Sequence, residues 1–133
     1  TSAIKALKAF NINKISVFTP YTKSINDSVL NYFKKENITV NELTYFDIES
    51  DLDIGKVDEK YLIEVLSKIN LEDSEALFVS CTALPVLSII EKLEERLNKI
   101  VLSSNQTLIW DSLNLIGYKD DIEGFGKLFK IST

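Results

Sequence analysis

Short apolar runs alternate along the chain with longer segments in which apolar residues recur at helical spacing. Four segments predict β-strands: three short runs rich in β-branched or aromatic side chains and one longer segment, residues 38–46, in which apolar and polar residues alternate loosely. They cover residues 14–18, 38–46, 76–79 and 99–102. The segments around them predict amphipathic helices, since their apolar residues recur every three or four positions. We expect these helices over residues 2–10, 24–37, 57–69, 84–97 and 106–116.

The order of these elements predicts the fold class. An opening helix is followed by a strand and a helix, repeated four times with short connections. This alternation is typical of an α/β domain, in which a parallel sheet is covered by helices on both faces. We therefore expect one domain over residues 1–133, a three-layer sandwich with a four-stranded parallel sheet, flavodoxin-like or Rossmann-like. No repeat, low-complexity tract or linker interrupts the pattern.

The periodicity also predicts which side chains face the core and where helices end. We expect Gly117 to end the last helix and Ser103 to Asn105 to cap its start. Residues 118–133 carry the weakest pattern. The predicted buried positions are Ile4, Leu7, Ile25, Val29, Leu30, Phe33, Val57, Tyr61, Ile63, Val65, Leu66, Ile69, Leu84, Leu87, Ile90, Leu93, Leu97 and Trp110.

Cys81, the only cysteine of the chain, follows the apolar strand 76–79 directly after Ser80. Pro85 fits the first turn of the next helix, where its missing N–H costs nothing. Ligands of parallel α/β sheets bind at the carboxyl ends of strands, and a helix N-terminus favours a thiolate. A lone cysteine is more often a packing residue than a nucleophile. Because Cys81 lies at this strand-to-helix turn, we treat the interpretation as a nucleophile and the interpretation as a packing residue as equally well supported.

Two other strand ends open toward the same edge of the predicted sheet, at Thr19-Pro20-Tyr21 and at Ser103 to Asn105. Together with Cys81 they offer a thiol, a phenol, hydroxyls, an amide and helix N-terminal N–H groups. Such groups suit a small anion, in particular a carboxylate. Simpler explanations stay open, because Tyr21 could cap the sheet edge and Ser103 to Asn105 could serve only as a helix cap.

Composition excludes several classes of function. The net charge of −5 argues against nucleic acid and anionic membranes as partners. The absence of histidine and the single cysteine argue against a metal site, and the acidic segment 47–53 is better explained as a solvated loop than as a calcium site. The chain has no phosphate-binding loop motif of the form G-x-x-x-x-G-K-[ST]. Gly124-Phe-Gly126 lacks the third glycine of a dinucleotide fingerprint. One cysteine and no apparent signal peptide favour a reducing, cytoplasmic location.

Three of these segments resemble a known family. They are Thr19-Pro20-Tyr21 followed by Asn26, then Ser80-Cys81-Thr82-Ala83-Leu84, then 101–106 (Val-Leu-Ser-Ser-Asn-Gln) with Trp110. Together they are similar to the second half of the Asp/Glu racemase superfamily, in particular the maleate cis–trans isomerase and arylmalonate decarboxylase group. The resemblance extends from the opening helix to Phe125-Gly126. It implies a two-lobed enzyme with its site in the cleft and with neither metal nor organic cofactor.

The resemblance also implies roles for single residues. Cys81 corresponds to the catalytic thiol of the second half, and Tyr21 to a phenol that hydrogen-bonds a substrate carboxylate. Thr82 and Ala83 correspond to positions whose backbone N–H groups bind carboxylate, and Asn26 belongs to the same substrate-binding set. The decarboxylase pattern has two glycines where this chain has Thr82-Ala83, which favours the isomerase or racemase side.

Asp51 departs from the isomerase pattern, which has an asparagine at that spacing. A carboxylate there repels a dianionic substrate unless it is protonated or turned away. That difference argues against maleate itself and favours a substrate with an amine or a smaller negative charge.

We therefore expect the carboxyl-terminal half of a cofactor-independent isomerase or racemase that acts on a small carboxylic or dicarboxylic acid. Because the resemblance covers only the second half of the family, we infer that the chain is a fragment, one half of a split enzyme or a proteolytic product. The absence of methionine fits either a fragment or removal of the initiator ahead of Thr1. Its partner would be the missing amino-terminal half or a second copy across the cleft, and we expect a homo-oligomer. Two alternatives stay open: a cofactor-free decarboxylase of substituted malonates, and a non-catalytic flavodoxin-like module that binds a small anion.

Overall fold

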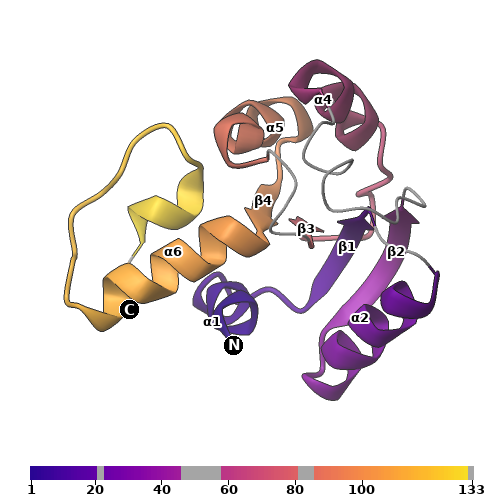
Figure 1. The fold of residues 1–133 in the computed structure, drawn as a ribbon, viewed down its shortest axis with the longest axis horizontal. Coiled ribbons are helices and arrows are strands. Elements are labelled where there is room, and N and C mark those ends of the chain that lie inside the picture. The colour runs from indigo at the N-terminus through magenta and orange to yellow at the C-terminus, as the bar shows by residue number, and fades with distance from the viewer. Residues whose placement is uncertain (21–22, 46–57, 81–85, 132–133) are drawn as a thin grey trace.

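The computed structural model describes residues 1–20, 23–45, 58–80 and 86–131. Helices and strands alternate along these ranges as the sequence predicts (Figure 1). The strands are β1 (Lys14–Thr19), β2 (Thr39–Tyr45), β3 (Ala76–Val79) and β4 (Ile100–Ser103). The helices are α1 (Ser2–Ala9), α2 (Lys23–Lys35), α4 (Glu59–Ser67), α5 (Ile90–Leu97) and α6 (Ser104–Leu115), with short 3-10 turns η1 (Leu87–Ile89) and η2 (Lys127–Lys130).

The four strands form one parallel sheet in the order β2-β1-β3-β4. Helices α1, α2 and α6 pack on one face and α4 and α5 on the other. Every residue of β3 is buried, as expected for a central strand that is covered on both sides. The predicted three-layer α/β architecture is confirmed.

Two separate apolar cores hold the helices to the sheet. Along each strand, successive side chains point to opposite faces, so Leu77 and Val79 pack toward α4 and α5 while Ala76 and Phe78 pack toward α1 and α2. On the second side Phe33 meets Phe78 edge to face, with ring centroids 5.5 Å apart. Each core therefore depends on the register of the strands between them.

Some predicted core positions are wrong. Tyr61 is 50% exposed and Ile25 is 46% exposed, whereas Leu62 and Asn26 are buried. The Asp58 side chain caps α4 by accepting a hydrogen bond from Lys60 N, and the helix then buries Leu62, Ile63 and Leu66. In α2 and α4 the apolar residues do not recur regularly enough to fix which side of the helix faces the sheet. The predicted buried side was therefore wrong by one position in each helix, and the observed side is set by tertiary contacts.

The helix after β3 begins later than predicted. The 3-10 turn η1 precedes it, and α5 itself starts only at Ile90. Tight turns of this kind are common at the amino ends of α-helices. Positions Leu84 and Pro85, which the sequence places in the first turn, lie outside the described residues.

The segment after α6 folds back and is fastened by buried polar side chains. The two carboxylate oxygens of Glu94 accept hydrogen bonds from Val101 N at 3.0 Å and Lys127 N at 2.8 Å. Trp110 Nε1 donates to Ile131 O at 2.8 Å. Burial raises the pKa of Glu94 although these two N–H groups oppose the shift. A region with little sequence pattern is thus positioned by α5 and α6.

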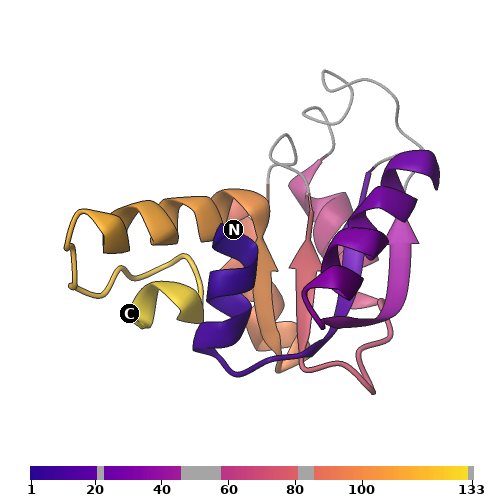
Figure 2. The same cartoon turned by 90° about the horizontal axis from the view of Figure 1, so that it is seen from below.

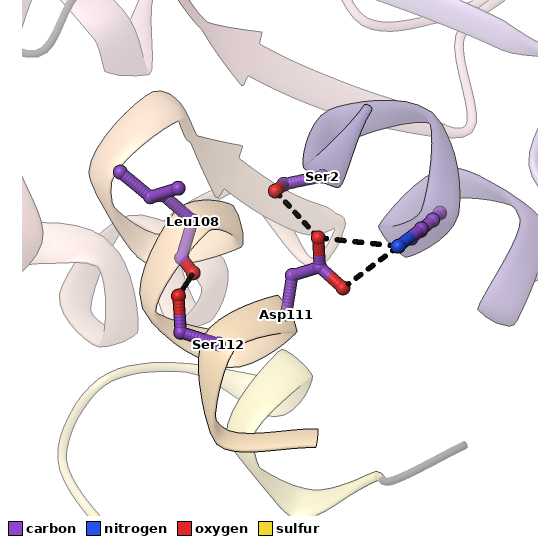
Figure 3. Close-up of polar contacts among 5 residues, drawn as sticks. Ser2, Leu108, Asp111 and Ser112 are labelled. Atoms are coloured by element: carbon purple, nitrogen blue, oxygen red, sulfur yellow. Dashed lines mark hydrogen bonds and ion pairs between the residues drawn. The ribbon is translucent and has the colours of Figure 1, made fainter. Parts of the chain in front are cut away.

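Helix α1 is tied to α6 on the outer side of the sheet (Figure 3). Asp111 accepts a hydrogen bond from the Ser2 hydroxyl at 2.8 Å and lies 3.2 Å from Lys5 Nζ. The Ser2 hydroxyl, followed by Lys5, lowers the pKa of Asp111. The first helix is therefore part of the domain.

Gly126 lies where the segment after α6 packs closely against Ile90 and Glu94 of α5. Its φ of +95° lies in the region that favours glycine, and a Cβ there would stand 2.7 Å from Ile90 Cγ2 and 3.0 Å from a Glu94 oxygen. We expect Gly126→Ala to lower the free energy of unfolding by about 2 to 4 kcal/mol. Gly117 has a φ of +83° but no described atom within 4 Å of such a Cβ, so Gly117→Ala should cost only about 1 kcal/mol. Urea unfolding measures both, and equal losses would contradict the proposed close approach.

Candidate active site

The carboxyl ends of the strands lie together at one edge of the sheet (Figure 2). β1 ends at Thr19, β3 at Val79 and β4 at Ser103. β1 and β3 are neighbours in register, with Phe18 opposite Val79. The pairing continues past the end of β3, because Ser80 N donates to Phe18 O at 2.9 Å.

The chain leaves β1 and β3 toward opposite faces of the sheet. After β1 it enters α2, on the same side as α1, and after β3 it enters α5, on the other side. Such a reversal between neighbouring strands opens a crevice outside their carboxyl ends, where ligands of open α/β sheets bind. On this topological ground we take the edge beside Thr19 and Ser80 as the candidate site.

The predicted catalytic residues follow these two strand ends in sequence. Tyr21 comes two residues after Thr19, and Cys81 comes directly after Ser80. Tyr21, Cys81, Thr82, Ala83 and Asp51 all lie outside the described residues. What the structure establishes is that the strands leading to Tyr21 and to Cys81 are hydrogen-bonded neighbours.

Among the residues to which the family resemblance gives a role, Asn26 is the one that the structure describes. Its side chain is 1% exposed, and its carbonyl oxygen accepts a hydrogen bond from the hydroxyl of Thr19, which is also buried. This bond joins the end of β1 to the first turns of α2. The sequence indicated Asn26 through the family resemblance but gave no sign that Thr19 is its partner.

The amino end of α6 is fixed at the same edge. Ser103 Oγ accepts from Gln106 N at 3.1 Å, and Ser103 N donates to Gln106 Oε1 at 3.2 Å. This reciprocal pair is a capping box, so the prediction that Ser103 caps the helix is confirmed. Gln106 was missed, although a serine followed three residues later by glutamine is the signal for it. Its Nε2 also donates to Phe125 O at 3.0 Å.

An apolar groove of about 410 Å³ adjoins this edge on the side of α1 and α2. Ser80 and Ser104 stand at the strand ends, and Ile25 and Val29 of α2 line its wall. Its remaining lining residues are Thr1, Ala3, Ser28, Tyr32, Phe33 and Phe78.

Two further findings concern what the described ranges contain. No cluster of three or more acidic, cysteine or histidine side chains within them could hold a metal ion. None of their helices combines the length and the apolar character that crossing a bilayer requires.

The comparison with protein families is decisive. The family model described as arylmalonate decarboxylase matches residues 1–129. The chain belongs to the arylmalonate decarboxylase family. This finding confirms the resemblance that the strand-end motifs indicate.

Similar curated proteins carry two names. The chain is 25% identical over 94% of its length to a maleate isomerase from Alcaligenes faecalis, of which it covers 50%. It is 24% identical over 97% of its length to the arylmalonate decarboxylase of Bordetella bronchiseptica, of which it covers 55%. The chain thus spans about half the length of the curated relatives that it matches.

Solved structures of this group share the fold. A cysteine-to-serine variant of the Nocardia farcinica maleate cis-trans isomerase, with a covalently bound succinylcysteine intermediate, superposes with a TM-score of 0.93 at 18% identity, over 99% of this chain and 54% of the other. The maleate isomerase of Pseudomonas putida S16 with maleate gives a TM-score of 0.92 at 23% identity, over 97% of this chain and 52% of the other.

The bond between Thr19 and Asn26 can be tested by a double-mutant cycle. We expect Thr19→Val to lower the free energy of unfolding by about 1 to 3 kcal/mol, because a buried acceptor on Asn26 loses a donor. The cost should shrink in an Asn26→Leu background, with a coupling of about 1 kcal/mol. Thr44→Val, at a half-buried position on β2, should change stability by at most about 0.5 kcal/mol. Additive effects of the Thr19 and Asn26 substitutions would contradict the bond.

Proposed function

We propose that the chain forms one lobe, the carboxyl-terminal half, of a cofactor-independent isomerase that acts on a small dicarboxylic or carboxylic acid. The observation that carries this proposal is the pairing of β1 with β3, which brings the strand ends before Tyr21 and Cys81 side by side at a switch point. Membership of the family and the isomerase names of several relatives support it. A facing lobe, from the other half of the enzyme or from a second copy, would close the cleft.

Cys81 is the proposed nucleophile. As a thiolate, its sulfur adds to one carbon of the carbon–carbon double bond, and the electron pair of that bond moves onto the adjacent carboxylate as an enediolate. The remaining carbon–carbon single bond rotates. Return of the electron pair then expels the thiolate and forms the trans double bond. The Nocardia farcinica structure, a cysteine-to-serine variant that still carries a succinylcysteine, shows that a cysteine of that relative forms an adduct of this kind. It does not assign the adduct to the counterpart of Cys81.

The other site residues have proposed roles in holding charge. Tyr21 donates a hydrogen bond to the carboxylate on which charge develops, and the backbone N–H groups of Thr82 and Ala83 bind the same or the second carboxylate. Asn26 remains a predicted member of the substrate site. Its bond to Thr19 holds the strand end from which Tyr21 follows.

A decarboxylase of substituted malonates is the second candidate. The family description and the Bordetella bronchiseptica relative favour it, and the apolar groove beside Ser80 could accept a bulky substituent. In that reaction Cys81 would only donate a proton to a planar enediolate after loss of carbon dioxide. Thr82 and Ala83, in place of two glycines, argue for the isomerase. Release of carbon dioxide from an arylmalonate, without conversion of maleate to fumarate, would reverse this preference.

Covalent capture tests the role of Cys81 without requiring a complete two-lobed site. We expect maleate to add to Cys81 at least about 10-fold faster in the folded chain than in the urea-unfolded chain, because the folded site lowers the thiol pKa and orients the ligand. Intact-mass and peptide mass spectrometry measure the adduct. Cys81→Ser should form none, and Ser112→Ala, on α6 and outside the groove, should react like the wild type. Equal rates in the folded and unfolded chains would contradict a preformed binding site. They would show that the fold does not activate Cys81, as expected for a packed or an ordinary thiol.

Asp51 gives a test of substrate charge. If its carboxylate faces the substrate, Asp51→Asn removes a repulsion and should tighten maleate binding by about 10-fold. Asp53→Asn, which removes the same charge two residues away, should change binding by less than about 2-fold because solvent screens it. Calorimetric titration with maleate measures both. Equal effects of the two substitutions would show that Asp51 has no specific place in the site.

A further inference from the structure

Two buried polar side chains, one from α5 and one from α6, hold the same corner of the chain. The corner is residues 125–127, where the segment that returns after α6 enters η2. From α5, Glu94 Oε1 accepts a hydrogen bond from Lys127 N at 2.8 Å. From α6, Gln106 Nε2 donates to Phe125 O at 3.0 Å. We call residues 125–127 the corner.

The corner fits closely but buries little apolar surface of its own. A Cβ on its middle residue, Gly126, would stand 3.0 Å from Gln106 Nε2 and 3.0 Å from Glu94 Oε1. Phe125 is 37% exposed and meets Phe129 edge to face, with ring centroids 6.3 Å apart. The residue after Gly126 is exposed as well, whereas η2 is anchored separately by its own buried residues. A shift of the corner therefore changes its two polar contacts without uncovering the buried part of η2.

Gln106 connects the corner to the candidate site. While its Nε2 donates to Phe125 O, its Oε1 accepts from Ser103 N at 3.2 Å. The side chain is fully buried, so no solvent replaces a lost partner. Ser103 ends β4 at the edge where the candidate site lies, and Ser104 lines the adjoining groove. The amide that holds the corner is therefore the same amide that caps α6 at the site edge.

Glu94 is the titratable member of this set of contacts. Its second oxygen, Oε2, accepts from Val101 N on β4 at 3.0 Å, so both oxygens bind N–H groups. These bonds favour the ionised carboxylate and burial opposes it. Burial is the larger effect, and the pKa of Glu94 is raised. Such a group stabilises the folded form when protonated, and this contribution is lost as pH rises through the folded pKa. Ionisation of Glu94 therefore favours an opening that admits water to it.

The surrounding charges leave the carboxylate of Glu94 only partly compensated. The other charged side chains of the hollow of about 270 Å³ beside it are Glu91, Glu95, Lys127 and Lys130. Glu91 raises the pKa of Glu94 further and Lys127 lowers it. Lys130 is paired with Glu123 at 3.1 Å. β4 contributes no charged side chain, since its residues are Ile-Val-Leu-Ser.

We propose that the corner is a proton-sensitive link between α5 and the candidate site, with Glu94 and Gln106 as its two positioning residues. With Glu94 protonated, the corner stays seated and keeps Gln106 against Ser103. Loss of that proton favours release of the corner from Glu94, so that the corner moves outward and Gln106 loses Phe125 O. The capped start of α6 then loosens. The site edge is therefore most ordered at acidic pH and loosens as pH rises through the titration of Glu94.

A pH titration of the ¹⁵N-labelled chain by NMR tests this link. We expect the amide signals of Lys127 and Val101 to shift with a common midpoint above the ordinary 4.5, because both amides bind Glu94. The Ser103 amide should follow with the same midpoint, and its hydrogen-exchange protection factor should fall at least about 3-fold across it. Glu94→Gln should abolish all three transitions. Glu95→Gln, which removes an exposed carboxylate at the next position, should leave them in place. A Ser103 signal that does not follow Lys127, or a midpoint at or below 4.5, would overturn the proposal.

A second variant tests the route. Val101 and Ser103 lie on the same strand, so the titration could reach Ser103 along β4 rather than through the corner. In Gln106→Met the Lys127 signal should still titrate, which also shows that the chain is folded, whereas the Ser103 signal should no longer follow. A Ser103 signal that still titrates in this variant would overturn the link through the corner. The readout involves neither maleate nor Cys81, so its failure would leave the proposed function standing.

Discussion

Pairing between β1 and β3 is the interaction on which the rest of this structure depends. It aligns Ile15 to Phe18 with Ala76 to Val79 and continues to Ser80. The same register assigns alternate side chains to the two cores, so a shift by one residue would turn each strand's apolar residues to the wrong face. The chain leaves these strands toward opposite faces, which is the topology at which ligands of open α/β sheets bind. Stability and the placement of the two strand ends therefore depend on one set of backbone hydrogen bonds.

Buried polar side chains connect this sheet to everything outside it. Thr19 and Asn26 join β1 to α2, the Ser103–Gln106 capping box fixes the start of α6 on β4, and Glu94 holds the returning segment. Each is paired, which is the condition for burying a polar group without a large cost. Their effect is to position the strand ends and α6, whereas the free energy of folding comes mainly from the two apolar cores.

The sequence predicted the strands well and the helix rotations less well. β3 is observed over the predicted residues because a short, wholly apolar run between turns is too short for a helix and is typical of a buried strand. Tyr61 and Ile25 were predicted to be buried and are exposed, since an amphipathic pattern tolerates a rotation that only packing partners select. The segment ending in η2 had no readable period because buried polar contacts from Glu94 and Gln106 hold it, and no local pattern reports those.

For the site, sequence motifs indicated which strand ends matter, and the structure added that β1 and β3 are neighbours. Thr19 was not predicted as a partner of Asn26, because a hydrogen bond between a strand and a helix has no signature in residue order. The outward-facing leucines and isoleucines of α6 illustrate the reverse case: the helix was predicted, but only the structure shows that its apolar side is the exposed one.

The most direct test of the central claim is the pH dependence of iodoacetamide alkylation at Cys81, with and without maleate. The proposal that Cys81 is the nucleophile of a carboxylate site predicts that its thiol ionises at least about one pH unit below the ordinary value near 8.5 and that maleate slows its alkylation. A midpoint at or above that value, with no protection by maleate, would contradict the claim that these two strand ends form an active site.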